Sequence, residues 1–259
     1  INRYGMNNDG LERFLARVGA WRVAGGREIL GINVSPNKDA VNGPHGYVTC
    51  VAALAPYADY LVMNISSPNT PGLRGLQNRA ELTELLASVK VARDRGAARP
   101  PLLAKIAPDL TSEMRADIAE VVLAAGIDGM IVTNTTVARP DDLPARYCNE
   151  AGGLSGAPLL AQSTEVLRDM HRLTNGKIPL IGVGGVASGA DAYAKIRAGA
   201  ALVQLYTALV FEGPYLVQRI KNDLAVLLRR DGFARLQDAV GADSRAPDHR
   251  GLEQHRRSV

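Results

Sequence analysis

Short apolar runs alternate along this chain with longer segments whose apolar residues recur at helical spacing. Glycine, proline or polar residues bound each run, as they commonly bound strands. The alternation of strands with helices indicates βαβ units and a parallel sheet, which places the chain in the α/β class. Six strands are predicted in this way, over Ile29–Val34, Tyr60–Ile65, Leu102–Ile106, Met130–Asn134, Leu180–Val183 and Leu202–Tyr206.

The segments between the strands carry the start and stop signals of helices. Thr111 is suited to cap a helix, and Gly126 is suited to end it before the next strand. No internal repeat or low-complexity linker divides the chain, so one domain is expected. The predicted helices are Glu81–Arg95, Ser112–Ala125, Thr164–Leu173, Asp191–Ala198 and a last helix from Pro214 to about Arg230.

The number of strand–helix units sets the architecture. A closed (β/α)8 TIM barrel needs eight units, and this chain is expected to supply roughly the last six of them. The chain begins with Ile1 instead of a start methionine, and the next residues already form a dense polar motif, NRYGMNNDG. No leader is visible, and we expect the chain to be the C-terminal part of a longer polypeptide.

The composition agrees with a parallel α/β fold, because 46% of the residues are hydrophobic and only 5% are aromatic. The net charge is +4. Much of the excess lies in residues 244–259, which we expect to form a basic, disordered tail; a patch for anionic lipid or nucleic acid is the minor alternative. Nothing resembles an interleaved aromatic and basic nucleic-acid surface. Cys50 and Cys148 fit a reducing compartment, and no apolar run approaches the roughly 18 residues of a membrane span.

Polar residues stand near the carboxyl ends of four consecutive predicted strands: Asn33, Asn64, Lys105 and Thr133. In a barrel of this type the carboxyl ends of the strands carry the active site. The loop from Asn64 to Thr70 reads NISSPNT and holds two carboxamides and three hydroxyls with little carbon bulk. These are ordinary turn residues, so one such loop alone would more often be scaffold. Their recurrence at successive strand ends favours a binding site.

Two further features indicate a cofactor with a phosphate group. Lys105 lies between aliphatic residues, and a buried ammonium needs an anionic or electron-rich partner. The alternative is that Lys105 lies on an edge strand or at the surface. The last two units are rich in glycine, as in IGVGGVASG from Ile181 onwards, and glycines let the backbone approach a phosphate closely. Tight turns use glycine too, but barrels commonly bind phosphate after their last two strands.

Seven motifs, in this order and spacing, resemble dihydroorotate dehydrogenase of the quinone-dependent class 2. They are NRYGMNN, NISSPNTPGLR, KIAPDL, VTNTTVARP, GGLSG, IGVGGVASG and VQLYTAL, and the match extends to about Asp243. The resemblance implies a barrel that binds flavin mononucleotide (FMN) over residues 1–243, without its first strand and its N-terminal membrane-docking helices. It implies oxidation of (S)-dihydroorotate to orotate in pyrimidine biosynthesis, with electrons passed through FMN to a membrane quinone.

The resemblance also implies the role of each site residue. Ser67 matches the catalytic base, at a position where the soluble class 1 relatives have a cysteine. Because a serine hydroxyl is a poor base, a closed, dry site and a proton relay are implied, with Thr70 as a plausible member. Carboxamides suit a flat ring that bears a carboxylate and an imide, and the implied substrate ligands are Asn2, Arg3, Tyr4, Gly5, Met6, Asn64, Asn69, Asn134 and Thr135. The implied FMN ligands are Asn33, Asn64, Lys105, Thr133, Gly156, Gly185, Tyr206 and Thr207, with Lys105 at the pyrimidine end of the flavin and the last three at the phosphate. No metal ligand is implied.

The sequence departs from the family pattern at three places. Met6 stands where the family has phenylalanine, Ser35 and Pro36 replace Gly-Lys, and residues 41–46 look less helical than in relatives. The third and largest departure is the absence of everything before the NRYG motif, including the first strand and two lysines that contact flavin and substrate. We therefore expect the 259-residue chain to be inactive by itself.

Two alternatives stay open beside the dehydrogenase hypothesis. In the first alternative, the chain is a non-catalytic remnant that binds FMN or phosphate. In the second, it is a flavin-free phosphosugar barrel enzyme, but this hypothesis leaves Ser67 and the asparagines unexplained. The expected partners of the dehydrogenase are dihydroorotate, orotate and a quinone, without nucleic acid. Peripheral association with the inner membrane is expected through the missing N-terminal region, on the cytoplasmic side in a bacterium or in the mitochondrion of a eukaryote.

Overall fold

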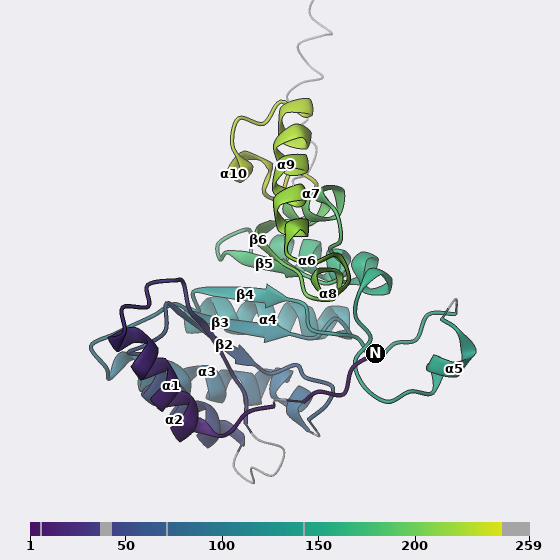
Figure 1. Ribbon diagram of the computed structural model, residues 1–259. Helices are drawn as coiled ribbons and strands as arrows, with labels where there is room; N and C mark the ends of the chain where they lie inside the picture. The colour runs from purple at the N-terminus through teal and green to yellow at the C-terminus, as the bar shows by residue number, and fades with distance from the viewer. Residues whose placement is uncertain (6, 37–42, 71, 142, 245–259) are drawn as a thin grey trace, which may run out of the picture.

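The computed structural model describes residues 1–5, 7–36, 43–70, 72–141 and 143–244. Its centre is one sheet of six strands, all parallel, whose spatial order follows the order in the chain (Figure 1). The strands are β1 (Gly31–Val34), β2 (Tyr60–Asn64), β3 (Leu102–Ile106), β4 (Gly129–Val132), β5 (Leu180–Val183) and β6 (Ala200–Gln204). Sequential order with a helix in each connection is the topology of a barrel wall.

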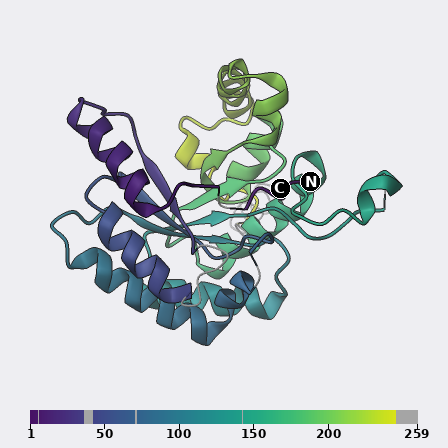
Figure 2. The same ribbon diagram turned by 60° about the horizontal axis from the view of Figure 1, so that its bottom comes forward.

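Helices follow the strands and pack side by side outside the sheet, from α2 through α3, α4, α6 and α7 to α9 (Figure 2). A loop that carries α5 extends away from the body. The helices are α1 (Leu11–Val23), α2 (Gly43–Leu54), α3 (Arg79–Asp94), α4 (Ser112–Ala125), α5 (Ala145–Cys148), α6 (Leu160–Leu173), α7 (Gly189–Arg197), α8 (Thr207–Glu212), α9 (Tyr215–Arg230) and α10 (Leu236–Ala239), with 3-10 turns η1 (Leu73–Gln77) and η2 (Ala157–Leu159). Among the described residues, none of these helices is both long and apolar enough to cross a membrane.

The two faces of the sheet differ because side chains alternate along each strand. One face packs against the helices and forms the large core, with Met63, Ala104 and Met130 among its fully buried residues. The opposite face forms a smaller cluster of Val62, Leu103, Ile131 and Ile181. This second face corresponds to the inside of a barrel, and the polar residues of the strand ends continue it toward the carboxyl edge of the sheet.

The sheet is not closed in the described part of the chain, because β1 and β6 each pair with only one strand. Their inward-facing residues are exposed as a result: Gly31 and Asn33 on β1, and Leu202 on β6, whose exposed fraction is 63%. In a closed barrel the same positions are covered by the neighbouring strands. The fold is therefore a partial (β/α)8 barrel, as the sequence predicted.

Several strand ends differ from the predicted ranges. Strand β1 begins at Gly31 rather than Ile29, because the Leu30 amide donates to the Asp59 carboxylate instead of to a strand. Strand β4 ends at Val132 and β6 at Gln204, so the predicted ends at Asn134 and Tyr206 are wrong and both residues lie in loops.

The predicted helix signals are confirmed where the structure describes them. The Thr111 hydroxyl accepts from the Met114 amide at the start of α4, and Gly126 is left-handed at its end. Of the segment expected to be less helical, residues 43–46 form the first turn of α2, which differs from the expectation, and residues 41 and 42 lie outside the described residues. Residues 245–259 of the predicted tail lie outside the described residues.

Candidate active site

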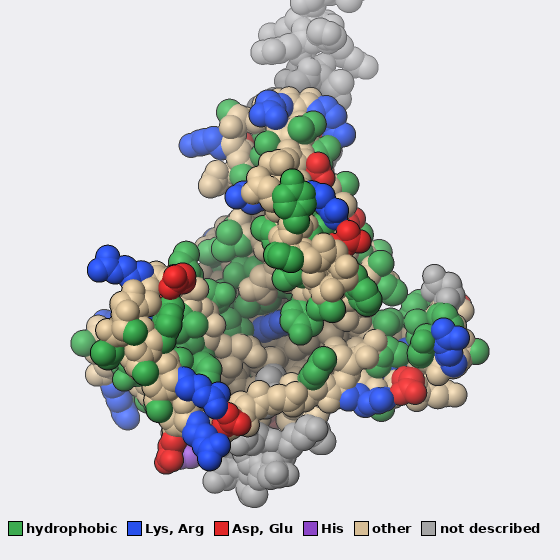
Figure 3. Space-filling view, in the orientation of Figure 1, with side chains coloured by type: hydrophobic (Ala, Val, Ile, Leu, Met, Phe, Trp, Pro, Cys, Tyr) green, Lys and Arg blue, Asp and Glu red, His purple; other side chains and the backbone are tan. Residues whose placement is uncertain are grey.

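A cavity of about 740 Å³ lies at the carboxyl ends of β3 to β6. Figure 3 shows the molecule hollowed at its centre, with a basic side chain inside the hollow. Among the described residues that line the cavity, Lys105 is the only lysine or arginine. The cavity brings together nine of the predicted site residues, from segments far apart in the sequence: Asn2, Lys105, Thr133, Asn134, Thr135, Gly156, Gly185, Tyr206 and Thr207.

The predicted loop after β2 meets the loop after β4 through their asparagines. The Asn134 side-chain amide donates to Asn64 Oδ1 and to Ser66 Oγ, both at 3.1 Å. Asn134 Oδ1 in turn accepts from the Thr135 amide at 2.8 Å. The buried Tyr47 hydroxyl donates to the Asn64 carbonyl at 2.6 Å and fixes the start of the loop. Each carboxamide is thereby held in one orientation before any ligand arrives.

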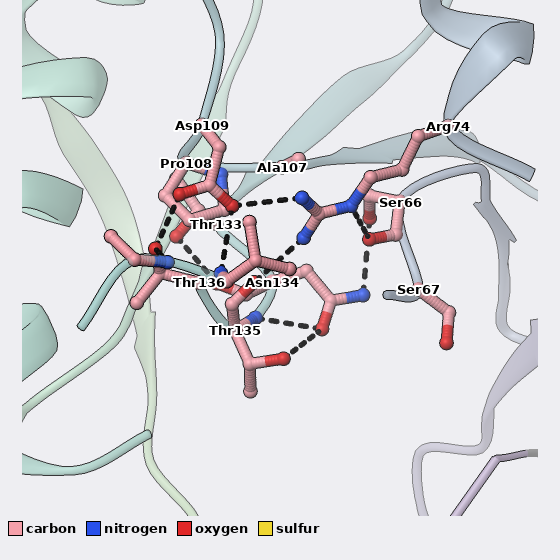
Figure 4. A network of polar contacts seen from close by, with 12 residues as sticks. Ser66, Ser67, Arg74, Ala107, Pro108, Asp109, Thr133, Asn134, Thr135 and Thr136 are labelled. Carbon is pink, nitrogen blue, oxygen red and sulfur yellow. Dashed lines mark hydrogen bonds and ion pairs between the residues drawn. The ribbon is translucent and has the colours of Figure 1, made fainter. Parts of the chain in front are cut away.

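Arg74 joins three loops, and no role was predicted for it from the sequence. It donates to the carbonyl oxygens of Ser66 and Thr135 at 3.2 and 3.0 Å, and forms an ion pair with Asp109 at 2.8 Å (Figure 4). Asp109 also accepts from the Thr136 hydroxyl and from the Val137 amide. Both charged residues lie inside motifs that carried the resemblance, PGLR and KIAPDL. Their position in those motifs was the available signal, but only the folded chain shows what they hold together.

Ser67 lies at the margin of this network and is 5% exposed. Its hydroxyl points away from the Arg74–Asp109 pair (Figure 4) and accepts from the Asn69 amide at 3.3 Å. The Asn69 side chain donates to the carbonyl and side-chain oxygens of Asn2, both at 3.3 Å. Thr70 Oγ1 is buried and has no hydrogen-bond partner among the described residues. The hydroxyls of Ser67 and Thr70 are thus shielded from bulk water, as a site for proton transfer requires.

Lys105 reaches the same region from β3, where it pairs in register with Asn64 of β2. No hydrogen bond or ion pair to its ammonium is found within the described residues, although it lines the cavity. Burial lowers the pKa of Lys105, because an apolar environment disfavours its charged form. A partner that is anionic or rich in electrons would restore the charged form, as the sequence led us to expect.

The opposite side of the cavity is made of backbone. Gly184 and Gly185 follow β5 with φ angles of 114° and 76°, which favour glycine. A Cβ added to Gly185 would lie 2.5 Å from Leu160 Cβ, and one added to Gly184 would lie 2.6 Å from Ser163 Oγ. Both glycines therefore press directly on the start of α6. We call this pair, Gly184 and Gly185, the glycine cradle.

Some predicted site residues lie elsewhere. Asn33 lines a different cavity, beside α1 and α2. Arg3 pairs with Glu150 and donates to the Ala151 carbonyl, so its guanidinium points toward the loop that carries α5. Tyr4 is 68% exposed, and Gly5 does not line the cavity of the strand ends. Met6 lies outside the described residues.

Polar side chains and a glycine cradle at the carboxyl ends of parallel strands define an enzyme of the α/β barrel class. A family profile described as dihydroorotate dehydrogenase matches residues 1–228. The chain belongs to the dihydroorotate dehydrogenase family.

Its relatives are of the quinone-dependent kind. A protein of Xanthobacter autotrophicus named dihydroorotate dehydrogenase (quinone) is 56% identical over 249 residues, which cover 95% of this chain and 70% of that protein. The mitochondrial protein of the same name from Mus musculus is 51% identical, over 95% of this chain and 64% of its own length. The crystal structure of DHODH from Eimeria tenella in complex with ferulenol matches with a TM-score of 0.90 and 39% identity, over 95% of this chain and 72% of that one. The chain thus covers about two thirds of these relatives.

Proposed function

We propose that this chain forms the dihydroorotate-oxidising site of a quinone-dependent dihydroorotate dehydrogenase (EC 1.3.5.2), with FMN as cofactor and Ser67 as catalytic base. The observation that carries the proposal is the junction of the NISSPNT loop with the Asn134–Thr135 loop, directly beside a cavity that ends in a glycine cradle. The reaction belongs to pyrimidine biosynthesis, as the family assignment implies.

The residues around the cavity fit FMN. Gly184 and Gly185 line the cavity, and an added Cβ at Gly185 would collide with Leu160 of α6. The glycine backbone is therefore the part of this loop that is offered to a phosphate. Lys105, which has no protein partner within the described residues, stands on the other side of the cavity, where an electron-rich ring would pair with it. Thr133, Gly156, Tyr206 and Thr207 line the space between. When bound, FMN would supply the hydride acceptor.

The chain's own residues then orient the substrate and hold the proton. Asn64, Asn69 and Asn134 present amide donors and carbonyl acceptors that match a carboxylate and an imide. Ser67 Oγ accepts the proton from the ring carbon next to the carbonyl. A hydroxyl is a weak base, so the proton has to pass onward; Thr70 Oγ1, which is buried and has no partner among the described residues, is the proposed next member.

The substrate roles of the first segment and the flavin role of Asn33 stay predictions. Asn2 lines the cavity and bonds to Asn69, whereas Arg3, Tyr4 and Gly5 require a rearrangement of the first segment to reach a substrate; Met6 lies outside the described residues. Asn33 reaches the flavin only if the cavity on β1 joins the main one. We propose a quinone as the final electron acceptor, which the names of the relatives include, one of them with the word mitochondrial. We also propose peripheral association with an inner membrane, bacterial or mitochondrial.

The test is a spectrum and a turnover assay on protein purified from its complete reading frame. FMN should be retained, visible as flavin absorbance, and dihydroorotate should bleach it in the absence of a quinone and support turnover in its presence. A sample that contains inorganic phosphate and dihydroorotate but no protein serves as the blank of the assay. The 259-residue chain, assayed in parallel, should retain less FMN, because the sheet of its described residues is open at both β1 and β6.

Other results would decide between the alternatives. Flavin absorbance without bleaching by dihydroorotate would indicate a non-catalytic binding protein. A colourless protein that does not take up added FMN would contradict the proposal and favour a flavin-free enzyme.

A further inference from the structure

One ionisable residue is fully buried outside the site described so far. Lys195 on α7 has no exposed surface, and no carboxylate forms an ion pair with it in the described structure. Its stem passes over Gly182 of β5, where an added Cβ would lie 3.2 Å from Lys195 Cβ and 3.1 Å from Ala200 Cβ. Small residues on β5 and β6 thus make room for a long charged side chain between the sheet and the helices.

The head of this lysine reaches the back of the glycine cradle. Its ammonium donates to Ser163 Oγ at 2.5 Å. The Ser163 hydroxyl donates to the Leu159 carbonyl at 2.7 Å and lies 3.2 Å from the carbonyl oxygen of Gly184. Gly184 lines the cavity on its other side. One hydroxyl therefore separates the Lys195 ammonium from the backbone that faces the cavity.

Little charge surrounds Lys195 apart from Asp191. Asp191, one turn earlier on α7, is engaged by the Ser188 hydroxyl and the Ala187 amide. Asp223 of α9 lies against Gly189, at the first turn of α7. From α6 the lysine meets a serine, and from β5 and β6 a glycine and an alanine, none of which is charged. Burial lowers the pKa of Lys195 to about 7, and Asp191 opposes this shift only in part.

We infer that Lys195 is a positioning residue for the phosphate group of the cofactor, which adds positive charge to the glycine cradle from behind through Ser163. The inference rests on the proposed function, because it takes FMN as the ligand of the cavity. A lysine buried without a carboxylate destabilises the empty protein. A phosphate dianion on the far side of Gly184 compensates for that charge, since charges interact strongly where water is excluded.

The interaction between Lys195 and the phosphate should be visible in the pH dependence of FMN binding. A bound dianion favours the charged lysine and so raises its pKa. Above pH 7, where Lys195 of the empty protein loses its proton, FMN binding would take up a proton. The affinity for FMN should then fall as the pH rises, by at most about tenfold per pH unit for one proton.

The experiment measures the dissociation constants of FMN and of riboflavin, which lacks the phosphate. Protein from the complete reading frame is freed of flavin and titrated by fluorescence quenching between about pH 7 and about pH 9, above the range where a phosphate monoester titrates. The variants are Lys195→Met, which keeps the volume, and Ser163→Ala, which removes the linking hydroxyl. Lys221→Met, on the exposed side of α9, is the matched control.

For the native protein and the control, the FMN dissociation constant should rise about tenfold across this range, and that of riboflavin should stay constant. Lys195→Met should bind FMN about tenfold more weakly than the native protein near pH 7, with a flat profile and unchanged riboflavin affinity. Ser163→Ala should also lose FMN affinity and keep riboflavin affinity, which provides a second test if Lys195→Met folds poorly.

Native protein that binds FMN while Lys195→Met shows the same affinity and the same pH profile would overturn this inference and leave the proposed function standing. An equal loss of FMN and riboflavin affinity in both variants would also overturn it, because the lysine would then serve only the packing of α6 against α7. Native protein that binds no FMN would overturn both proposals.

Discussion

The loop after β4 presents side chains to the cavity and is hydrogen-bonded to the loop after β2, whereas the loop after β5 presents mainly backbone. On the first side Asn64, Ser66 and Asn134 bond to one another. On the second side Gly184 and Gly185 press on α6, and the charge stands behind them on Lys195. A planar ring with directed donors and acceptors requires fixed side chains, but a phosphate is satisfied by backbone amides and a nearby positive charge.

The comparison has a consequence for substitutions. On the substrate side, a changed side chain should alter the rate of the chemical step and spare the cofactor. On the phosphate side, a substitution should weaken the retention of FMN. The protein molecules that still hold FMN should react at the native rate. Four substitutions or measurements test this separation, and the expected effects decrease from the first to the last.

Ser67→Ala should lower the rate of flavin reduction by dihydroorotate by roughly 10²- to 10⁴-fold, because the proton loses its acceptor. The FMN content should stay as in the native protein, since no bond of the glycine cradle changes. Stopped-flow absorbance measures the first quantity and the flavin-to-protein ratio the second. Ser112→Ala, at an exposed position on α4, is the control. A rate within a few-fold of the native value would remove Ser67 as the base.

Arg74→Lys should lower kcat by about 10- to 100-fold. A lysine keeps the charge but cannot hold the Ser66 and Thr135 carbonyls and Asp109 in one plane, and small displacements of reacting groups are costly. FMN retention should not change. Arg79→Lys is the matched control, because Arg79 forms exposed ion pairs with Asp117 and Glu120 on the helix surface. Loss of FMN in the Arg74 variant would break the proposed separation of the two sides.

Gly185→Ala should weaken FMN binding by about tenfold or more, which corresponds to at least ~1.4 kcal/mol. The added Cβ would lie within 2.6 Å of Leu160 Cα, and the φ angle of 76° is itself unfavourable for alanine. Gly232→Ala separates the two causes, because Gly232 has a φ of 77° and no atom within 4 Å of an added Cβ. Equal FMN affinity in the two variants would show that the close approach to Leu160 does not matter.

The smallest effect concerns stability without flavin. The pKa of Lys195 is about 7 in the folded protein against 10.5 for a free lysine. Between these values the unfolded chain binds more protons, so stability rises with pH, by up to about 1.4 kcal/mol per pH unit from this group. Below pH 7 Lys195 is protonated in both the folded and the unfolded state, so it no longer contributes to the change of stability with pH. Urea unfolding of the flavin-free protein at about pH 7.5 and about pH 9 should show this rise, whereas Lys195→Met should show less of it. Parallel slopes in the two proteins would contradict a buried, uncharged lysine.

The glycine run after β5 and the asparagines at the strand ends could be predicted from the sequence, because each follows from local chemistry. A carboxamide at the exit of an aliphatic run and a glycine cluster before a helix are visible in any sequence. Arg74 and Lys195 were not readable, because their partners lie 35 and 32 residues away in the chain. Nothing local distinguishes Lys195 from an exposed lysine on a helix, since its burial depends on Gly182 and Ala200 of two other elements.

The sequence by itself determined the alternation of strands and helices, their parallel order and the family, because periodicity and ordered motifs are properties of the chain. Only the tertiary structure decided which polar residues meet. It joined Asn64 to Asn134 and directed Arg3 toward Glu150 instead of the cavity. It also left the inward faces of β1 and β6 uncovered. The physical reason is that hydrogen bonds and burial depend on distances between segments, and those distances exist only once the sheet has formed.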